Sequence, residues 1–477
     1  MALKLFNTLT REKEEFEPKE EGKVKFYSCG QTIYDDLHIG NARPYAVWDT
    51  LRRYLEWKGY TVRHVQNITD VGHLTDDGDQ GEDKVEKRAK DLGLEPMELV
   101  EDQIERYFED TKALNIERQD IVPRATGHVN EMINYVQSII YNDYAYERDG
   151  NIYFDLEAYI QDYTYGEMAK KDIQQLKQEA ESRVEPDERK KNQYDFALWL
   201  NATGGHLMKW DAKFEIEGET VESTGYPGWH LECSVMGQKY LGDEFDIHAG
   251  GKDHIFPHHP NERAQCFAAT GEGQACYWLH NEFVMWEGEQ MSKSTGNFVT
   301  VRDMLDEFSG DVIRLYLMSF HYRTEANFSR EGLEKAEKEL KKVRRFLKRM
   351  DREASDGGKQ FEGLEQNFDE KMEDDLNTAK AKQVLMEAIN RSNKALDRGE
   401  EVDPSVAEKI VELFQILGVE VRSDTSVQEQ EMADLMLELR EKFREQQHYD
   451  TADMIRDRLE EIGFEVEDTD EGAFWVR

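Results

Sequence analysis

The sequence is poor in cysteine, because a chain of 477 residues contains only four. So few cysteines do not form a disulfide framework, and they predict a protein of a reducing compartment, the cytoplasm. Long apolar runs are also lacking, since no stretch approaches the roughly 18 continuous apolar residues of a membrane span. Residues 1–8 lack the apolar core of a secretory signal peptide. We therefore expect neither a membrane-spanning helix nor a secreted disulfide-rich protein.

Basic residues are scarce as well. The 61 Lys and Arg face 101 Asp and Glu, which gives a net charge of −40 at pH 7. Contact with phosphates requires clustered cations, so this charge argues against a nucleic-acid partner. In ~1 M salt, however, the Debye length is only about 3 Å, and an acidic surface then keeps a protein soluble without long-range repulsion of RNA. Composition leaves both interpretations open.

The stretch 24–41 organises the chain. Residues 24–27 predict a short buried strand, Gly30 ends it, and a helix with Pro44 in its first turn follows a polar turn. Apolar residues recur on one face of that helix at Tyr45, Trp48, Leu51 and Leu55. A strand, a glycine-containing turn and a helix start form a phosphate-binding device, because free N–H groups face the ligand. Cys29 and His38 are the groups here that could do chemistry.

Residues 60–70 predict a second strand, so strand, helix and strand would form a right-handed parallel crossover. The Asp- and Gly-rich segment 72–83 does not match the EF-hand calcium template, and we expect a solvated loop there. An amphipathic helix is predicted over 126–140. We predict that residues 128–220 form an insertion that splits the nucleotide-binding fold.

A second dense stretch holds six of the 13 histidines, between residues 230 and 280. His258 and Glu262 lie four apart, so a helix that either Pro257 or Pro260 opens would place them on one face. Cys29 and Cys233 could add two thiolates, and such a mixed set suits Zn²⁺. Alternatively, these are separate polar residues that line a cleft. Spacing alone does not decide between the two.

The third motif is the loop 290–298, whose single ammonium and several hydroxyls suit a mobile phosphate clamp, although such a loop alone is usually only a loop. Beyond residue 330 the chain predicts charged helices. One of them carries a core-facing stripe of Leu333, Ala336, Leu340, Val343, Leu347 and Met350. Residues 423–426 predict a linker before a last unit with one long helix, a short helix and a tail.

Together these motifs resemble the cysteinyl-tRNA synthetase family, class I aminoacyl-tRNA synthetases, over essentially the full length. The HIGH signature of the family corresponds to residues 38–41 and its KMSKS loop to residues 290–294. Cys29 before the first motif, and the segments 228–234 and 256–259, make the resemblance specific. Two departures stand out: Asn41 replaces the second His of HIGH, and Gln290 replaces the first Lys of KMSKS, which removes one cation.

The resemblance implies an α/β fold with a Rossmann-like class I catalytic domain split by an insertion, then a helical bundle and a small C-terminal anticodon-binding domain. We expect the following bounds: catalytic domain, first half, 1–127; insertion 128–220; second half with the zinc site and KMSKS-like loop 221–300; linking stem-contact region 301–330; helical bundle 331–425; C-terminal domain 426–477.

The resemblance further implies a cytoplasmic enzyme that joins L-cysteine to tRNA(Cys) through a cysteinyl-adenylate, using ATP with Mg²⁺. The implied zinc ligands, one ion per chain, are Cys29, Cys233, His258 and Glu262. The implied ATP site is His38, Gly40, Asn41, Met291, Ser292 and Lys293, of which His38, Asn41 and Lys293 are catalytic. The implied wall of the amino-acid pocket is Thr69, Trp229, His230 and His248.

Two other interpretations compete with this one. A non-catalytic zinc module could bind tRNA or another partner, but the presence of both His38 and Lys293 argues against it. A ligase on the same core could instead form an amide between cysteine and an amino sugar. By resemblance, such paralogues lack the C-terminal unit that residues 426–477 provide here.

The net charge remains to be reconciled with a tRNA ligand. Six cations cluster within residues 341–349: Lys341, Lys342, Arg344, Arg345, Lys348 and Arg349. They interleave with the apolar stripe, so we expect them on the exposed side of the helix, in contact with the tRNA backbone of a halophilic enzyme. The alternative is an ordinary solvated face paired with Glu337 and Glu339.

Overall fold

The computed structural model describes residues 2–75, 81–170, 175, 187–202, 204–291, 298–422, 427–469 and 472–476. The chain divides into two compact units, each described here by itself. The first comprises residues 1–307, 320–328 and 372–377, and the second comprises residues 308–319, 329–371 and 378–477. Among the described residues, no helix is long and apolar enough to cross a membrane.

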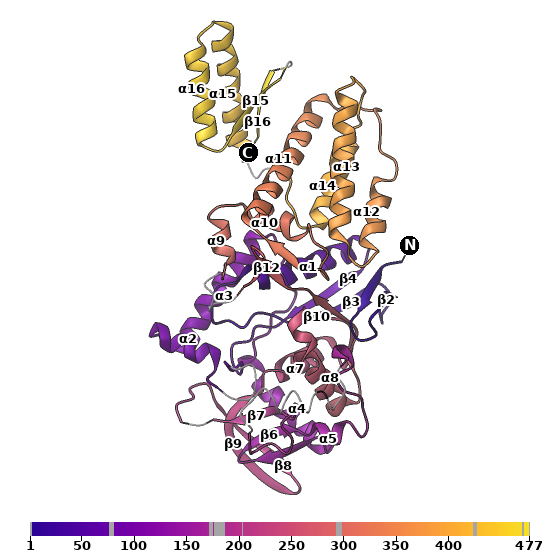
Figure 1. Cartoon of the computed structure of the whole chain (residues 1–477), viewed down its shortest axis with the longest axis vertical. Coiled ribbons are helices and arrows are strands. Elements are labelled where there is room, and N and C mark those ends of the chain that lie inside the picture. Colours follow the sequence, from indigo (N-terminus) through magenta and orange to yellow (C-terminus); the bar gives the residue numbers. More distant parts are fainter. Residues whose placement is uncertain are drawn as a thin grey trace. The chain divides into compact units, whose positions relative to one another are not determined.

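The first unit is built around a four-stranded parallel sheet (Figure 1) with the order β11-β10-β3-β4. Its strands are β3 (Lys23–Ser28), β4 (Thr61–Gln66), β10 (Glu244–Gly251) and β11 (Gln274–Asn281). Helix α1 (Ile39–Trp57) connects β3 to β4, so the predicted parallel crossover is confirmed. The chain leaves β3 towards β4 on one side and returns to β10 on the other, and ligands bind at such switch points in open α/β sheets.

Helix α1 begins directly after His38, which caps it: the imidazole Nδ1 accepts a hydrogen bond from the Asn41 N–H at 3.3 Å. The four predicted apolar positions are all buried. Pro44, however, lies at the sixth helical position and therefore in the second turn, which corrects the expected first-turn placement. The helix starts earlier than expected because His38, and not a later residue, provides the cap.

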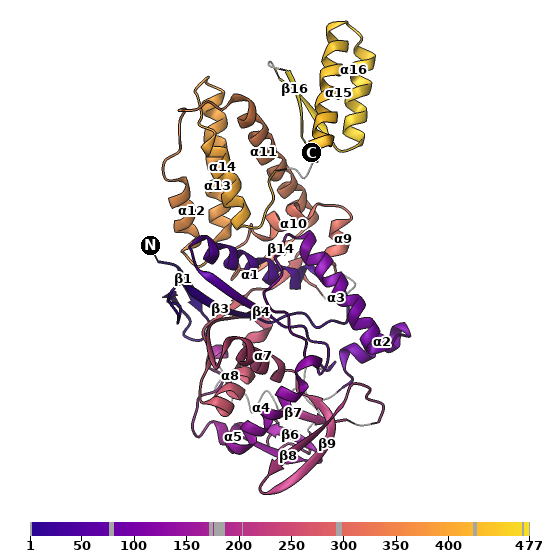
Figure 2. The ribbon, with the colours of Figure 1, turned by 180° about the vertical axis from the view of Figure 1, so that it is seen from behind.

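A second, antiparallel sheet of five strands has the order β5-β6-β7-β9-β8. Its strands are β5 (Ala145–Arg148), β6 (Asn151–Phe154), β7 (Phe196–Asn201), β8 (Trp210–Ile216) and β9 (Glu219–Pro227). Helix α4 (Val129–Tyr141) packs against this sheet (Figure 2). These elements span the predicted insertion and, in β9, run seven residues beyond residue 220.

Several shorter or covering elements complete the first unit. They are β1 (Lys4–Asn7), β2 (Glu12–Glu15), α2 (Lys84–Leu92), α3 (Pro96–Ala113), α5 (Leu156–Tyr159), α7 (Leu231–Leu241), α8 (His258–Thr270), β12 (Val284–Trp286), β13 (Glu289–Gln290), α9 (Val301–Leu305) and β14 (Ala326–Phe328). Helix α8 begins at His258 with Pro257 as its cap, which is one of the two starts that the sequence allowed.

The described parts of the segment 72–83 are only partly the solvated loop that we expected, because Thr75, Gly81 and Glu82 are exposed whereas residues 72–74 and Asp83 are buried. Asp83 is buried and caps α2, because its Oδ1 accepts from the N–H groups of Val85 and Glu86 at 2.9 and 3.1 Å. Its Oδ2 accepts from the Gly72 N–H at 2.7 Å and thereby closes the loop. Aspartate is a preferred residue at the start of a helix. The expectation of a loop rested on the Asp and Gly content of the segment and did not consider this role.

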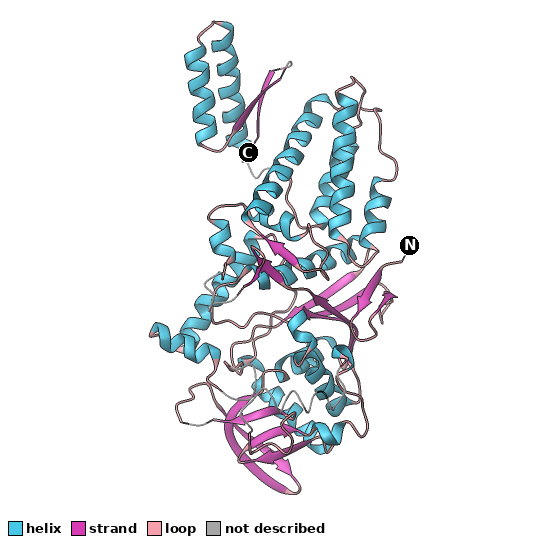
Figure 3. Cartoon of the chain, viewed as in Figure 1, coloured by secondary structure: helices cyan, strands magenta, loops and turns pink. Residues whose placement is uncertain are grey.

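Among the described residues of the second unit, the regular elements are helices except for one terminal hairpin (Figure 3). Its helices are α10 (Gly310–Leu317), α11 (Arg330–Glu353), α12 (Leu364–Met372), α13 (Thr378–Leu396), α14 (Ser405–Ile416), α15 (Val427–Glu445) and α16 (Tyr449–Glu461). The predicted apolar stripe of α11 is buried throughout. The predicted linker 423–426 lies outside the described residues. The predicted tail forms the antiparallel strands β15 (Glu465–Thr469) and β16 (Gly472–Val476).

The cations of α11 do not form the exposed face that we expected, since only Lys342 among the six is exposed. Lys341 Nζ lies 2.6 Å from Glu465 Oε1, and Arg345 pairs with both Glu465 and Glu467 of the hairpin. The expected backbone contact with tRNA therefore loses its basis. The cations are covered because they pair with carboxylates of the terminal hairpin, which lie more than a hundred residues away in sequence.

We predict that Arg345→Glu loosens the hairpin from α11, because it replaces two attractive pairs by repulsion of Glu465 and Glu467. Hydrogen–deuterium exchange of residues 465–469 should become roughly fivefold faster or more, since each half-exposed pair contributes up to about 1 kcal/mol. Lys342→Glu, a charge reversal at the exposed position of the same helix, serves as the control. Equal exchange in both variants would contradict the proposed contact.

Candidate active site

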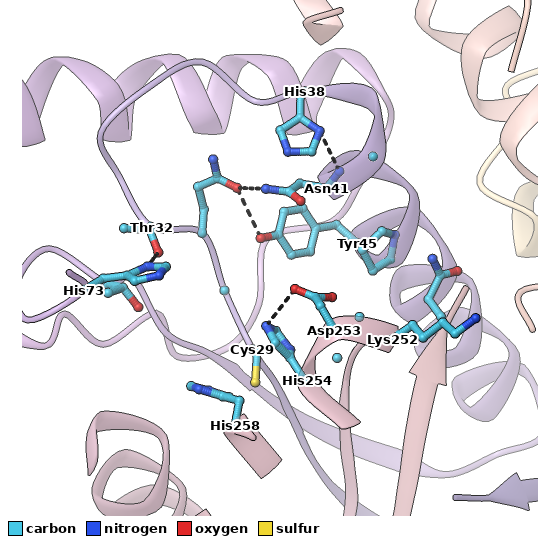
Figure 4. Close-up of a pocket in the computed structure, with 18 of the residues that line it drawn as sticks. Cys29, Thr32, His38, Asn41, Tyr45, His73, Lys252, Asp253, His254 and His258 are labelled. Atoms are coloured by element: carbon cyan, nitrogen blue, oxygen red, sulfur yellow. Dashed lines mark hydrogen bonds and ion pairs between the residues drawn. The ribbon is translucent and has the colours of Figure 1, made fainter. Parts of the chain in front are cut away.

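A cavity of about 380 Å³ lies at the carboxyl ends of the parallel strands (Figure 4). Each of the four strands contributes the residue at or just after its end: Cys29 follows β3, Asn67 follows β4, Gly251 ends β10 and Asn281 ends β11. Open parallel sheets bind ligands at this edge because the connections leave a crevice there. The sheet topology therefore places the cavity where the three sequence motifs meet.

The start of α1 forms one wall of the cavity, where His38, Gly40 and Asn41 line it. Asn41 Nδ2 donates to Gln31 Oε1 at 3.0 Å, and the Tyr45 hydroxyl donates to the same oxygen at 3.4 Å. A Cβ atom at Gly40 would lie 2.9 Å from the His38 ring, so any larger residue would displace the imidazole. The helix start thus offers the positive end of the helix dipole and a fixed imidazole, which suit an anion.

The KMSKS-like motif reaches the cavity at both of its described flanks. Met291 and Phe298 line the cavity, and the Phe298 ring lies 4.9 Å from the His38 ring, measured between centroids. The chain after the loop is bonded to the start of α1, because the Ile39 N–H donates to the carbonyl of Val299 at 3.1 Å. Ser292 and Lys293 themselves lie outside the described residues.

The four predicted zinc ligands lie together. Cys29, Cys233, His258 and Glu262 are buried, and their ligand atoms all lie within 4.8 Å of one another. His258 Nε2 is 3.1 Å from Glu262 Oε1, one turn along α8, and 3.7 Å from the Cys233 sulfur. Figure 4 shows the Cys29 sulfur beside His258. Two thiols, an imidazole and a carboxylate at this spacing fit Zn²⁺.

A second group overlaps the first, because Cys29, His248, His259 and Glu262 are equally close to one another. The two groups differ in their access to the cavity. Cys29, Cys233 and His258 line it, whereas Cys29 alone of the second group does so. A catalytic metal must be reachable by the substrate. The first group is therefore the better candidate for a metal that acts on a ligand in the cavity.

Charges within this cluster support metal binding. Burial alone would raise the pKa of Glu262, but His248 and His258 lower it to about 2, so that Glu262 is ionised. Burial likewise acts to raise the pKa of Cys29, yet a hydrogen bond with Cys233 and the nearby His259 hold it well below its usual value. An ionised carboxylate and a thiolate are the forms that bind a metal ion.

Of the four residues expected in the pocket wall, two line the cavity and the placement of the other two is corrected. Thr69 and Trp229 line the cavity, whereas His230 and His248 do not. His230 Nδ1 lies 2.7 Å from His258 Nδ1, and His248 Nε2 lies 2.8 Å from Glu262 Oε2. Each of these two histidines thus contacts a candidate ligand and can orient it.

Sequence reasoning missed several lining residues. His73 stacks on Trp229 with ring centroids 3.8 Å apart, and its Nδ1 lies 2.7 Å from the Thr32 hydroxyl. Glu232 lines the cavity next to Cys233, although no role was assigned to it. Its position inside the conspicuous segment 228–234, as an acid in an otherwise buried helix start, is a signal that could have identified it.

The chain is similar in sequence to known protein families and to individual proteins. The family described as tRNA synthetases class I (C) catalytic domain matches residues 15–338, and the DALR domain matches residues 367–421. A cysteine–tRNA ligase of Thermus thermophilus is 43% identical over 491 residues, with 100% of this chain and 99% of the relative covered. That of Thermococcus onnurineus is 40% identical over 498 residues, again covering 100% and 99%.

Solved structures share the fold at low identity. A methionyl-tRNA synthetase of Mycobacterium tuberculosis in complex with methionyl-adenylate aligns with a TM-score of 0.56 and 15% identity, over 83% of this chain and 89% of its own. A ternary complex of Agrobacterium radiobacter K84 agnB2 LeuRS, tRNA and LeuAMS aligns with a TM-score of 0.60 and 12% identity, over 85% and 84%. Because the class I model matches most of the chain and relatives 40% identical align along all of it, the chain belongs to the cysteine–tRNA ligase family of class I tRNA synthetases.

Proposed function

We propose that this enzyme charges tRNA(Cys) with L-cysteine in two steps, through a cysteinyl-adenylate formed from ATP with Mg²⁺. One observation carries the proposal: a single cavity joins the anion-binding start of α1 to the thiol, imidazole and carboxylate group of Cys29, Cys233, His258 and Glu262. The first feature suits the triphosphate and the second suits the substrate thiol. The family relationship supports both assignments.

In the first step, a carboxylate oxygen of cysteine attacks the α-phosphorus of ATP, and pyrophosphate leaves. Negative charge develops on the α-phosphate oxygens during this attack. The imidazole of His38, the side-chain amide of Asn41 and the positive dipole end of α1 are fixed, and they stabilise this charge without rearrangement. Lys293 adds a cation from the loop whose flanks, Met291 and Phe298, line the cavity.

Rejection of serine requires more than shape, since a hydrophobic pocket discriminates such isosteres by only roughly 10²-fold. A zinc ion held by Cys29, Cys233, His258 and Glu262 would supply a Lewis acid that prefers thiolate over hydroxyl. Glu262 is also bonded to His248, at 2.8 Å, which favours it as the weakly held ligand. Thr69 and Trp229 enclose the rest of the amino acid.

In the second step, the cysteinyl group moves to the 3′-terminal adenosine of tRNA and AMP leaves. The DALR domain match at residues 367–421 supports a tRNA partner. We propose that residues 426–477, which follow this match, bind the anticodon. A ligase that joins cysteine to an amino sugar would lack this C-terminal unit by resemblance. Here α15, α16 and the hairpin form a folded unit with its own apolar cluster.

The amino-acid specificity of ATP–pyrophosphate exchange tests the proposal directly. Of the twenty amino acids, cysteine alone should drive exchange, with serine about 10³-fold slower or more, because shape cannot reach that ratio and metal preference can. Transfer to tRNA(Cys) should follow in an aminoacylation assay. Exchange that serine drives as fast as cysteine would contradict the proposed function.

We predict that Cys233→Ser removes zinc from the purified protein, because a hydroxyl is a poor replacement for a thiolate ligand. Metal analysis should give about one zinc per chain for the parent protein and well below half for the variant. Cys266→Ser, at a buried thiol on α8 outside both ligand groups, should retain zinc. In cobalt-substituted enzyme, the thiolate charge-transfer band should shift with cysteine and not with serine. A band that cysteine leaves unmoved would make the metal purely structural.

Lys293→Ala should lower kcat for adenylate formation by about 10²-fold or more, since Gln290 leaves the loop with one phosphate-reaching cation. Cysteine binding, measured by equilibrium titration, should change little, because the ammonium acts on charge that develops in the transition state. If instead only the Michaelis constant for cysteine rises while kcat is kept, the assigned role is wrong.

A further inference from the structure

Glu232 is a buried carboxylate with only one of its two oxygens hydrogen-bonded to another described residue. It is the second residue of α7, is 2% exposed, and lines the cavity. Its Oε1 accepts a hydrogen bond from the Thr69 hydroxyl at 2.5 Å. Its Oε2 has no hydrogen-bond partner within the described part of the chain. Nearly all buried polar atoms in native proteins are paired, so an unpaired oxygen at a cavity wall points to a ligand.

The neighbouring acid behaves differently. Asp70 is also buried, but both of its oxygens are used, because they accept from the N–H and the hydroxyl of Thr126 at 2.9 and 2.6 Å. Asp70 does not line the cavity. Burial near the end of β4 therefore does not by itself leave a carboxylate unpaired. The unpaired oxygen distinguishes Glu232, which also lines the cavity.

The direction of Glu232 is fixed by the strand ends. Thr69 receives a hydrogen bond from Asn67 Nδ2 at 3.1 Å, and Asn67 Oδ1 accepts from the Gly30 N–H at 2.9 Å. A Cβ atom at Gly30 would lie 1.6 Å from the Asn67 carbonyl oxygen, so only glycine permits this approach. The chain Gly30, Asn67, Thr69 and Glu232 thus links the end of β3 to the start of α7.

We infer that Glu232 binds the α-ammonium of the substrate through Oε2, and so makes the cavity selective for an aminothiol over a plain thiol. The inference rests on the proposed function, in which the substrate sulfur lies at Cys29, Cys233 and His258. Cys233 follows Glu232 directly, and only two carbon atoms separate sulfur from nitrogen in cysteine. A buried carboxylate is stable in its charged form beside a cation, which an ammonium provides and a neutral group does not.

Calorimetric titration of the zinc-loaded protein with cysteamine and with propane-1-thiol tests the inference. The two ligands have the same size, and only cysteamine carries an ammonium. The parent protein should bind cysteamine at least tenfold more tightly. Glu232→Gln should weaken cysteamine by about 10- to 100-fold, the range for a hydrogen bond between charged groups, and propane-1-thiol by less than threefold. Asp70→Asn, which removes the neighbouring buried charge, should leave both affinities within about threefold.

Two results would overturn the inference. Equal affinity of the parent protein for the two ligands would show that no ammonium site exists, and this measurement needs no variant to fold. If Glu232→Gln lowered the affinity for both ligands by the same factor, Glu232 would only shape the pocket. The proposed function fails separately: a parent protein that prefers cysteamine but shows no cysteine-driven pyrophosphate exchange would refute cysteine activation and leave the ammonium site standing.

Discussion

The buried carboxylate of Glu262 is the constraint on which the catalytic half of the molecule depends. It is fully buried, and its oxygens lie 2.8 Å from His248 on β10, 3.1 Å from His258 on α8 and 3.3 Å from Gln274 on β11. An uncompensated charge at this depth would cost several kcal/mol, so these three elements must keep their positions. The same contacts of Glu262 therefore fix both the packing of α8 on the sheet and the positions of the candidate metal ligands.

A second buried charge holds helix α1, whose start lines the cavity. The Arg43 guanidinium, fully buried in α1, donates to the carbonyls of Glu282, Phe283, His321 and Thr324 at 2.9 to 3.2 Å. Burial lowers its pKa to about 10, which still leaves it charged at neutral pH. Carbonyl dipoles thus replace water around the cation. The start of α1, where phosphate is expected to bind, is held to the chain that follows β11 by this side chain.

Sequence reasoning succeeded where the determining contacts are local. The strand, turn and helix around Cys29 follow from the spacing of apolar residues, and the approach of His258 to Glu262 follows from one helical turn. It failed where a side chain's direction depends on distant elements. β10 is buried along nearly its whole length, so alternation could not tell whether His248 faces the cavity or the core. Likewise, nothing local to Lys341 indicates Glu465 as its partner, 124 residues away.

The pairing of α11 with the hairpin also bears on the excess of acidic residues. Ion pairs that are about 40% exposed, such as Arg345 with Glu465, are screened in salt and contribute little at molar concentration. Trp475 of the same hairpin is 4% exposed, and its indole N–H donates to Asp434 at 2.7 Å. Apolar burial is not weakened by salt in this way, because it does not depend on charge. In molar salt the hairpin would therefore be held mainly by Trp475 and the apolar cluster around it, and the cations of α11 contribute chiefly when salt is low.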